Sequence, residues 1–177
     1  MSEVSFEATR TRTDVLKALI ANTWRSPAAL LWYIGGSLLV AGIAFAVNDE
    51  QTVVTRMVVF AAAFGAMVAF YSLLFFVCLL FAARKSWTAP GGLEPIKFNL
   101  SATGLSAATA TAQGQSGWDN WKAAFETNSL IVIRHHLGLL QIIPKRNLDA
   151  MTVGRIREVL RAHIKGGVRL AAHGKIG

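Results

Sequence analysis

The dominant hydrophobic pattern of the chain is an apolar segment over residues 57–83, where 27 consecutive residues carry no charged side chain. A helix of this length, with a rise of ~1.5 Å per residue, would extend about 40 Å, more than the ~30 Å hydrocarbon core of a bilayer. Because such a helix is apolar on every side, it has no polar face to turn toward water. The segment therefore predicts a membrane-spanning helix.

A second uncharged apolar segment covers residues 28–47, and only the short connector 48–52 separates the two. Two spans joined so closely must be antiparallel neighbours, so residues 28–86 are predicted to form a transmembrane α-hairpin. Small residues at matching positions let helix backbones approach closely in a membrane. The first span offers Ser37 with Ala41 and Gly42 with Ala46, and the second repeats a small residue at every fourth position, at Ala61, Gly65 and Ala69. We expect this face of the second span to pack within the hairpin, with homodimerisation as the alternative.

The segment 1–27 is predicted to lie on the cytoplasmic side. Residues 1–11 mix charged and small polar side chains, and we expect them to be poorly ordered. From Thr13 to Trp24 the apolar positions follow one helical face, with Thr13 as the expected N-cap. This amphipathic helix is predicted to lie in the membrane interface until Pro27 breaks it.

The chain after the hairpin changes to short alternating segments, which predict a small antiparallel α+β domain over residues 93–166. Five strands are expected, at residues 97–100, 105–112, 121–126, 130–136 and 139–143. Gly104 is expected to supply a positive φ in the first turn, and residues 113–117 are expected to form a loop. Asp149 is predicted to cap a helix that runs to about residue 164, and residues 167–177 are expected to be a disordered tail.

The distribution of charge gives the predicted orientation. The net charge is +8, and Lys and Arg number four in residues 1–27, none in the connector and thirteen from residue 84 onward. Because short basic segments stay on the cytoplasmic side, both termini are predicted to be cytoplasmic in a multi-pass protein of the cell (inner) membrane. The positive charge is then explained by topology, and we expect no nucleic-acid partner.

Residues that carry catalysis or bind metals are scarce. Cys78 is the single cysteine, which excludes an intramolecular disulfide and a cysteine-based metal site. His135 and His136 are neighbours in a predicted strand and would point to opposite faces, so one metal ion cannot easily take both. We therefore expect no catalytic residue, no metal, no cofactor, no small-molecule substrate and no enzymatic activity.

Five basic side chains form the main candidate binding feature, at Lys145, Arg146, Arg157, Arg161 and Lys165. On a domain held near an inner leaflet, such residues would contact anionic headgroups, at roughly 1 kcal/mol each. The alternative is a solvated helix face. Trp118 and Trp121 could form a stacking platform, but we expect Trp121 to be a core residue and Trp118 to be more open to a surface role.

The order of these features resembles the YcxB-like family of bacterial membrane proteins. The resemblance covers roughly residues 28–165 and rests on the turn glycine Gly104, on Trp121 opening a strand that ends near Glu126, and on the segment Ile143-Pro144-Lys145-Arg146 before a closing helix. It implies a cytoplasmic domain similar to the bacterial pleckstrin-homology-like fold, with seven strands in two small sheets, as a β-sandwich or partly open barrel closed by a C-terminal helix. The family has no established enzymatic activity, and the resemblance implies no catalytic residues.

The sequence therefore predicts a membrane-anchored, non-enzymatic module whose cytoplasmic domain binds a protein partner or anionic lipid headgroups. The alternative is an accessory subunit of a transporter or larger inner-membrane complex, held through the small-residue face of the second span. A nucleic-acid-binding anchor is a third hypothesis, and it predicts binding that weakens steeply with salt.

Overall fold

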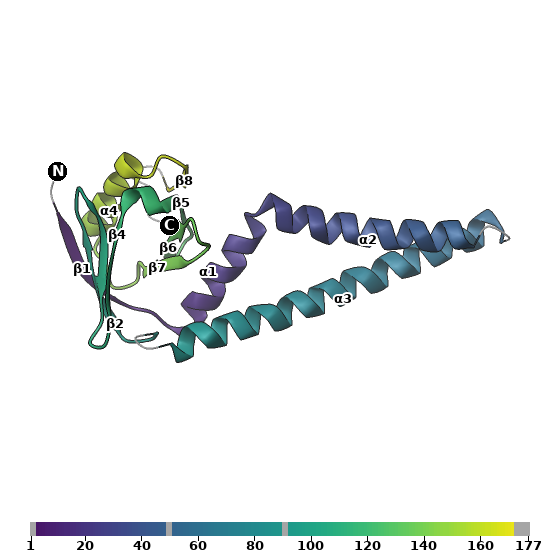
Figure 1. Cartoon of the computed structure of the whole chain (residues 1–177), viewed down its shortest axis with the longest axis horizontal. Helices are drawn as coiled ribbons and strands as arrows, with labels where there is room; N and C mark the ends of the chain where they lie inside the picture. The colour runs from purple at the N-terminus through teal and green to yellow at the C-terminus, as the bar shows by residue number, and fades with distance from the viewer. Residues whose placement is uncertain (1–2, 49–50, 90–91, 172–177) are drawn as a thin grey trace. The chain divides into compact units, whose positions relative to one another are not determined.

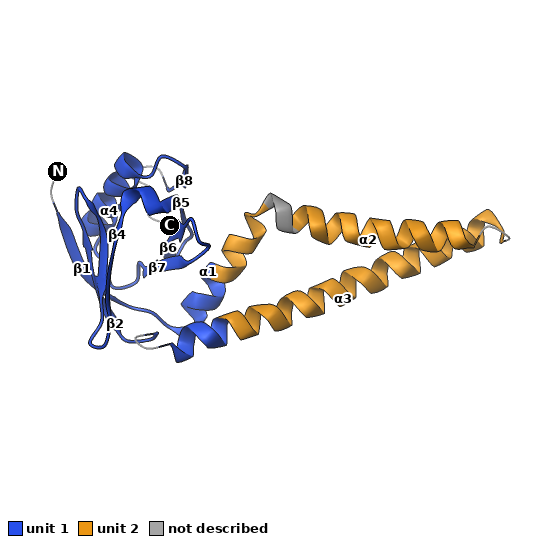
Figure 2. Ribbon diagram, viewed as in Figure 1, with its two compact units in different colours: residues 1–18, 83–177 blue, residues 19–82 orange. Residues whose placement is uncertain are grey.

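A computed structural model describes residues 3–48, 51–89 and 92–171. The chain forms two compact units, one made of residues 1–18 and 83–177 and the other of residues 19–82 (Figure 2). The second unit contains long apolar helices, and the first is a small domain with two β-sheets that do not close into a barrel. This confirms the predicted combination of an apolar α-hairpin with an α+β domain.

The apolar hairpin consists of α2 (Pro27–Val47) and α3 (Val53–Thr88) (Figure 1). Within the described residues, two helical segments are long and apolar enough to cross a membrane, Leu30–Val47 and Val53–Thr88. Helix α3 extends beyond the predicted span at both ends. Residues 49–50 of the connector lie outside the described part of the chain.

Polar and aromatic side chains determine which faces of α2 and α3 meet. The Tyr33 hydroxyl lies 2.6 Å from the Ser72 hydroxyl and donates to the carbonyl of Val68 at 3.2 Å. Nearer the connector, Arg56 Nε donates to the carbonyl of Phe45 at 3.2 Å. These contacts fix the rotation of α3 about its own axis.

The small-residue face of α3 does not pack against α2, contrary to our expectation. Ala61, Gly65 and Ala69 are exposed, and a Cβ added at Gly65 would meet no atom within 4 Å. The half-buried stripe of α3 includes Phe60, Phe64, Met67 and Tyr71 instead, on a neighbouring face roughly 100° around the helix from Ala61 and Gly65. On α2, by contrast, Ser37 and Ala41 are fully buried, whereas Gly42 and Ala46 are exposed, so only the first of the two small-residue pairs meets neighbours.

Sheet A has the strand order β1-β2-β3-β4, and all its neighbours are antiparallel. Its strands are β1 (Val4–Thr9), β2 (Pro95–Leu100), β3 (Gly104–Ala108) and β4 (Gln113–Gly117). The expectation of disorder at residues 1–11 is therefore wrong over β1, where Val4 and Ala8 are buried and alternate with exposed positions. The predicted loop at residues 113–117 is strand β4.

Sheet B has the order β7-β6-β5-β8, in which β8 runs parallel to β5. Its strands are β5 (Trp121–Glu126), β6 (Leu130–His135), β7 (Leu140–Pro144) and β8 (Gly167–Arg169), and a 3-10 turn, Trp118–Asn120, links β4 to β5. Strand β8 lies where a disordered tail was predicted, and the rest of that tail, residues 172–177, lies outside the described residues. Seven strands precede the last helix in the described chain, not five.

Helix α4 (Ala150–His163) closes the domain as predicted. Asp149 is its N-cap and accepts from the Thr152 N–H at 2.6 Å. The helix buries an apolar stripe in the core shared by both sheets, at Val153, Ile156, Val159 and Leu160. The core between the sheets is built mainly from Ile96, Phe98, Leu100, Ile131, Ile133 and Ile143. Burying such side chains is the main stabilisation of a domain of this size.

Helix α1 (Arg12–Trp24) begins two residues earlier than the expected cap at Thr13 implies. Asp14 Oδ2 accepts from the Thr11 N–H at 2.8 Å, and the Asp14 N–H donates back to the Thr11 hydroxyl at 3.3 Å. This reciprocal pair is a capping box, so Thr11 and not Thr13 is the N-cap. The predicted position of this helix in the membrane interface stays a prediction.

Gly104 and Trp118 have structural roles that differ from those predicted from the sequence. Gly138 is the residue with positive φ in the described chain, so Gly104 does not supply one. Gly104 is required instead because an added Cβ would collide with the carbonyl oxygen of Ser116 on β4.

Trp118 is 8% exposed, donates from Nε1 to the Ser101 carbonyl at 2.9 Å and stacks on His163, so it is a core residue and not a surface one.

Candidate functional site

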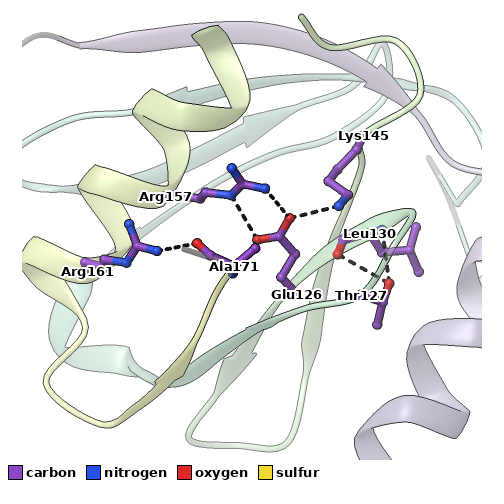
Figure 3. Close-up of polar contacts among 7 residues, drawn as sticks. All are labelled: Glu126, Thr127, Leu130, Lys145, Arg157, Arg161 and Ala171. Carbon is purple, nitrogen blue, oxygen red and sulfur yellow. Dashed lines mark hydrogen bonds and ion pairs between the residues drawn. The ribbon is translucent and has the colours of Figure 1, made fainter. Parts of the chain in front are cut away.

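Two of the five predicted basic side chains converge on a single carboxylate, Glu126, at the end of β5 (Figure 3). Arg157, on α4, donates from Nε at 3.0 Å and from Nη2 at 2.7 Å, one bond to each carboxylate oxygen. Lys145, which follows β7, donates from Nζ to Glu126 Oε1 at 2.8 Å. Three elements that are distant in sequence are therefore joined through one acid.

The Glu126 carboxylate is almost completely enclosed, since its side chain is 4% exposed. Burial alone would raise its pKa, but the hydrogen bonds from Arg157, Lys145 and the Ala171 N–H outweigh burial and lower the pKa of Glu126 to about 2. The hydrogen bonds that Arg157 makes to Glu126 raise the pKa of Arg157. Both partners are thus held in their charged forms at neutral pH.

The Glu126 cluster also fastens the segment that follows β8. The Ala171 N–H donates to Glu126 Oε2 at 3.0 Å, and the Ala171 carbonyl accepts from Arg161 Nη2 at 2.5 Å (Figure 3). The main chain at Ala171 is therefore held from both sides, by an acid of β5 and a cation of α4. A charge-assisted cluster of this kind is typical of a structural clamp.

The other predicted basic residues have different surroundings. Arg146 pairs with Asp14 at 2.8 Å and donates to the Thr9 carbonyl at 2.6 Å. Asp14 is buried, and although burial raises its pKa, hydrogen bonds from Thr11 and the charge of Arg146 lower it overall. Lys165 is 92% exposed and lies 3.8 Å from the equally exposed Asp119. Each of the five predicted cations therefore has a partner within the domain, and Lys145 and Arg157 share theirs.

A cleft with a volume of about 430 Å³ opens between sheet A and sheet B, and sequence reasoning gave no sign of it. One wall is the inner face of β3 and β4, including Leu105, and the other includes Trp121 and Leu139. Its physical cause lies in β4, whose inward positions are Gly114 and Ser116. Because these side chains are too small to fill the space between the sheets, the sandwich stays open on this side.

The cleft is lined by neutral polar and apolar side chains together with His135. Its polar lining consists of neutral groups, among them Gln115, Asn120 and Gln141. Among the described residues that line the cleft, His135 is the one with a titratable side chain. The Nε1 of Trp121 is buried with no hydrogen-bond partner in the described structure. Among the described residues, no group of three or more His, Cys, Asp and Glu side chains is placed to hold a metal ion.

The residues that carry the family resemblance have structural places. Trp121 is 9% exposed at the start of β5 and packs edge to face against the His135 ring, with 5.2 Å between the two ring centroids. Pro144 is fully buried at the end of β7, opposite Leu130. Gly104 lets β3 approach β4.

Comparison of the chain with protein-family models, curated proteins and solved structures gives no match.

Proposed function

We propose that this chain is a membrane-anchored, non-enzymatic module that holds its small domain at the cytoplasmic face of the cell (inner) membrane, where the domain binds a protein partner. The observation that carries the proposal is that the apolar hairpin is inserted between two paired strands. The chain passes from β1 through α2 and α3 to β2, and β1 and β2 pair from Val4↔Leu100 to Thr9↔Pro95. Both ends of the anchor therefore lead into one sheet, which keeps the domain beside the bilayer.

The engaged cations favour a protein partner over anionic lipid. Lys145 and Arg157 are already paired with the buried Glu126, and Arg146 with Asp14. A headgroup that took Lys145 or Arg157 would have to break a contact whose loss leaves the buried Glu126 charge without that partner, at a cost of about 3–5 kcal/mol. That exceeds the roughly 1 kcal/mol that each cation gains near an anionic surface.

The pleckstrin-homology-like and YcxB-like identity is part of the same proposal. It is supported by the seven described strands before α4, with β1–β4 in one sheet and β5–β7 in the other. Strand β8 is an addition to that arrangement, and the insertion of the hairpin after β1 is a feature that the resemblance did not lead us to expect.

Cysteine labelling in cells tests the anchoring and orientation. Starting from a Cys78→Ser variant, single cysteines are introduced at the exposed positions Gln51, in the connector, and Ala102, in the β2–β3 turn. A membrane-impermeant maleimide should label position 51 in intact cells and position 102 only after permeabilisation. The reverse pattern would refute the orientation, and labelling of both positions in intact cells would refute the spanning hairpin.

Hydrogen exchange of the full chain in nanodiscs separates the protein partner from the lipid headgroup. We expect the same exchange over α4 and over Lys145 and Arg146 in neutral discs and in discs with about a third anionic lipid. Added protection in anionic discs at these residues, removed by high salt, would overturn the choice of a protein partner.

A second candidate function is that of an accessory subunit in a larger membrane complex. The observation in its favour is the exposed face at Ala61, Gly65 and Ala69, because small residues are suited to close packing against another helix. A Gly65→Leu variant should then lose a larger assembly on native gels of mild-detergent extracts, while Gly35→Leu on α2 serves as the comparison. An unchanged assembly in Gly65→Leu would argue against this candidate.

A further inference from the structure

We propose that the free edge of β4, together with the cleft beside it, is a docking site for an extended, uncharged peptide segment of a protein partner. The segment would join sheet A next to β4 and place alternate apolar side chains in the cleft. This inference rests on the proposed function, because it names the surface where the module takes its partner.

The backbone of β4 has unused hydrogen-bonding groups. The Thr109 N–H donates to the Ala112 carbonyl at 2.7 Å, so these residues form a hydrogen-bonded pair at the start of the β3–β4 hairpin. Bonded and non-bonded pairs alternate along antiparallel strands. By the observed register, Gly114 bonds to β3, whereas Gln113 and Gln115 direct their N–H and C=O groups away from it. Within the described residues β4 pairs with β3 alone, so these groups are open to an added strand.

Strand β4 also lacks the features that usually protect an edge. Charged side chains, proline or very short length keep exposed edges from pairing with other chains. The other edge strands have such features: β1 carries Glu7, β7 ends in Pro144, and β8 has three residues including Arg169. Strand β4 reads Gln-Gly-Gln-Ser-Gly, without charge or proline. It is therefore the edge of the described sheets best suited to strand addition.

The cleft supplies the place for side chains. A strand paired with β4 would present every second side chain on the inner face, beside Gly114 and Ser116. A Cβ at Gly114 would meet no atom within 4 Å, so this space is open. At its rim, Leu139 lines the cleft and is 65% exposed, and Leu137 in the same turn is 81% exposed. Such exposed apolar groups favour an apolar occupant.

Charge and polarity define the partner segment further. The described lining of the cleft contains no Lys, Arg, Asp or Glu, so a charged side chain would lose its hydration without gaining a partner. Main-chain bonds to Gln113 and Gln115 would give affinity in any sequence, while the cleft would select one or two apolar side chains. The structure therefore points to a short uncharged stretch with apolar residues at alternate positions.

The test is selection from a peptide library. The full chain in nanodiscs is presented to a phage-displayed library of random eight-residue peptides, with empty nanodiscs as the counter-selection. Enriched peptides should carry apolar residues at alternate positions and no net charge. Their affinity is then measured for the wild-type chain and for variants whose folding is checked by hydrogen exchange of β3 and β5.

Three variants define the site. Gly114→Leu fills the cleft, and Gln115→Pro removes an outward N–H without breaking a bond to β3. Gly114→Leu should weaken binding at least about tenfold relative to wild type, and Gln115→Pro at least about tenfold relative to the matched Gln115→Ala variant, which keeps the N–H; each is a loss of roughly 1.4 kcal/mol.

Three results would overturn the proposal: no peptide enriched over empty nanodiscs, binding unchanged in both Gly114→Leu and Gln115→Pro, or loss in only one of them. Loss in Gly114→Leu alone would identify a compact apolar ligand that does not pair with the strand. The cysteine-labelling experiment reports orientation and does not depend on peptide binding, so failure of the proposed function and failure of this site are distinguishable.

Discussion

Replacing Glu126 by glutamine tests how much the domain depends on its buried carboxylate. The side chain is 4% exposed and accepts hydrogen bonds from Lys145, Arg157 and the Ala171 N–H. Glutamine keeps the size but removes the charge, which leaves two cations near the core without their counter-charge. Breaking a buried ion pair in this way costs about 3–5 kcal/mol.

The lowered pKa of Glu126 gives a second value for the free energy by which the ionised carboxylate stabilises the folded domain. The pKa falls from 4.5 to about 2 on folding, and at 1.36 kcal/mol per unit this is about 3 kcal/mol in favour of the ionised native state. Because the folded-state pKa is the lower one, this stabilisation is present above pH ~4.5 and is lost as the pH falls toward 2. The total stability of a small domain is about 5–15 kcal/mol, so the loss is a large fraction of it.

Pulse proteolysis in urea measures the effect on the full chain in mild detergent. With a urea m-value of about 2 kcal/mol per molar, a loss of 3–5 kcal/mol lowers the unfolding midpoint by roughly 2 M in Glu126→Gln at pH 7. The variant should also show a smaller fall in stability than wild type between pH 4.5 and pH 3, where the remaining fall comes from groups such as Asp14, whose pKa is also lowered. Glu7→Gln on β1, an exposed carboxylate in a strand, is the matched control and should change the free energy of unfolding by less than about 0.5 kcal/mol. A midpoint in Glu126→Gln equal to that of Glu7→Gln would refute the structural role of the cluster.

Two further predictions concern sheet A. Gly104→Ala should destabilise the domain by about 1–3 kcal/mol in the same assay, because the added Cβ meets the Ser116 carbonyl, whereas Gly114→Ala, in open space, should be neutral or slightly stabilising; equal effects would contradict the close approach of β3 and β4. Removal of residues 1–10 deletes β1, which leaves the edge of β2 unpaired and removes the stacking of Phe6 on Phe98, so β2 and β3 should lose hydrogen-exchange protection while α3 keeps its own; unchanged protection would show that β1 is dispensable.

The sequence predicted those elements whose pattern is long or whose neighbours are close in the chain. The hairpin helices, α4 with its cap at Asp149, and β5–β7 have strong periodicity or adjacent turns, and all are present. Strand β1 has the alternating pattern Val4, Phe6 and Ala8, but its partner β2 lies beyond the whole hairpin, so no local turn signalled it. Strand β4 has no hydrophobic residue at all, and only its pairing with β3 makes it a strand.

The candidate site was predictable in composition but not in geometry. The sequence shows the basic residues as a group, yet Lys145 and Arg157 meet a carboxylate that is far from both in sequence and that is isolated there from other acidic residues. The cleft arises from residues that are absent from the inner face of β4, where Gly114 and Ser116 stand in place of larger side chains. A strand with small inward side chains has a weak hydrophobic pattern. Such a strand cannot be distinguished from a loop unless its register with the neighbouring strand is known.

The insertion of the hairpin between β1 and β2 makes assembly of the domain conditional on membrane insertion. The ribosome makes β1 first, and β1 must wait unpaired until both apolar helices and then β2 have been made. If only one of the two helices crossed the bilayer, β1 and β2 would end on opposite sides and the pairing from Val4↔Leu100 to Thr9↔Pro95 could not form. Sheet A can therefore be completed only when both helices of the hairpin have crossed the bilayer in opposite directions. A wrongly inserted chain keeps β1 and β2 unpaired, and quality-control proteases can recognise such an incompletely folded domain.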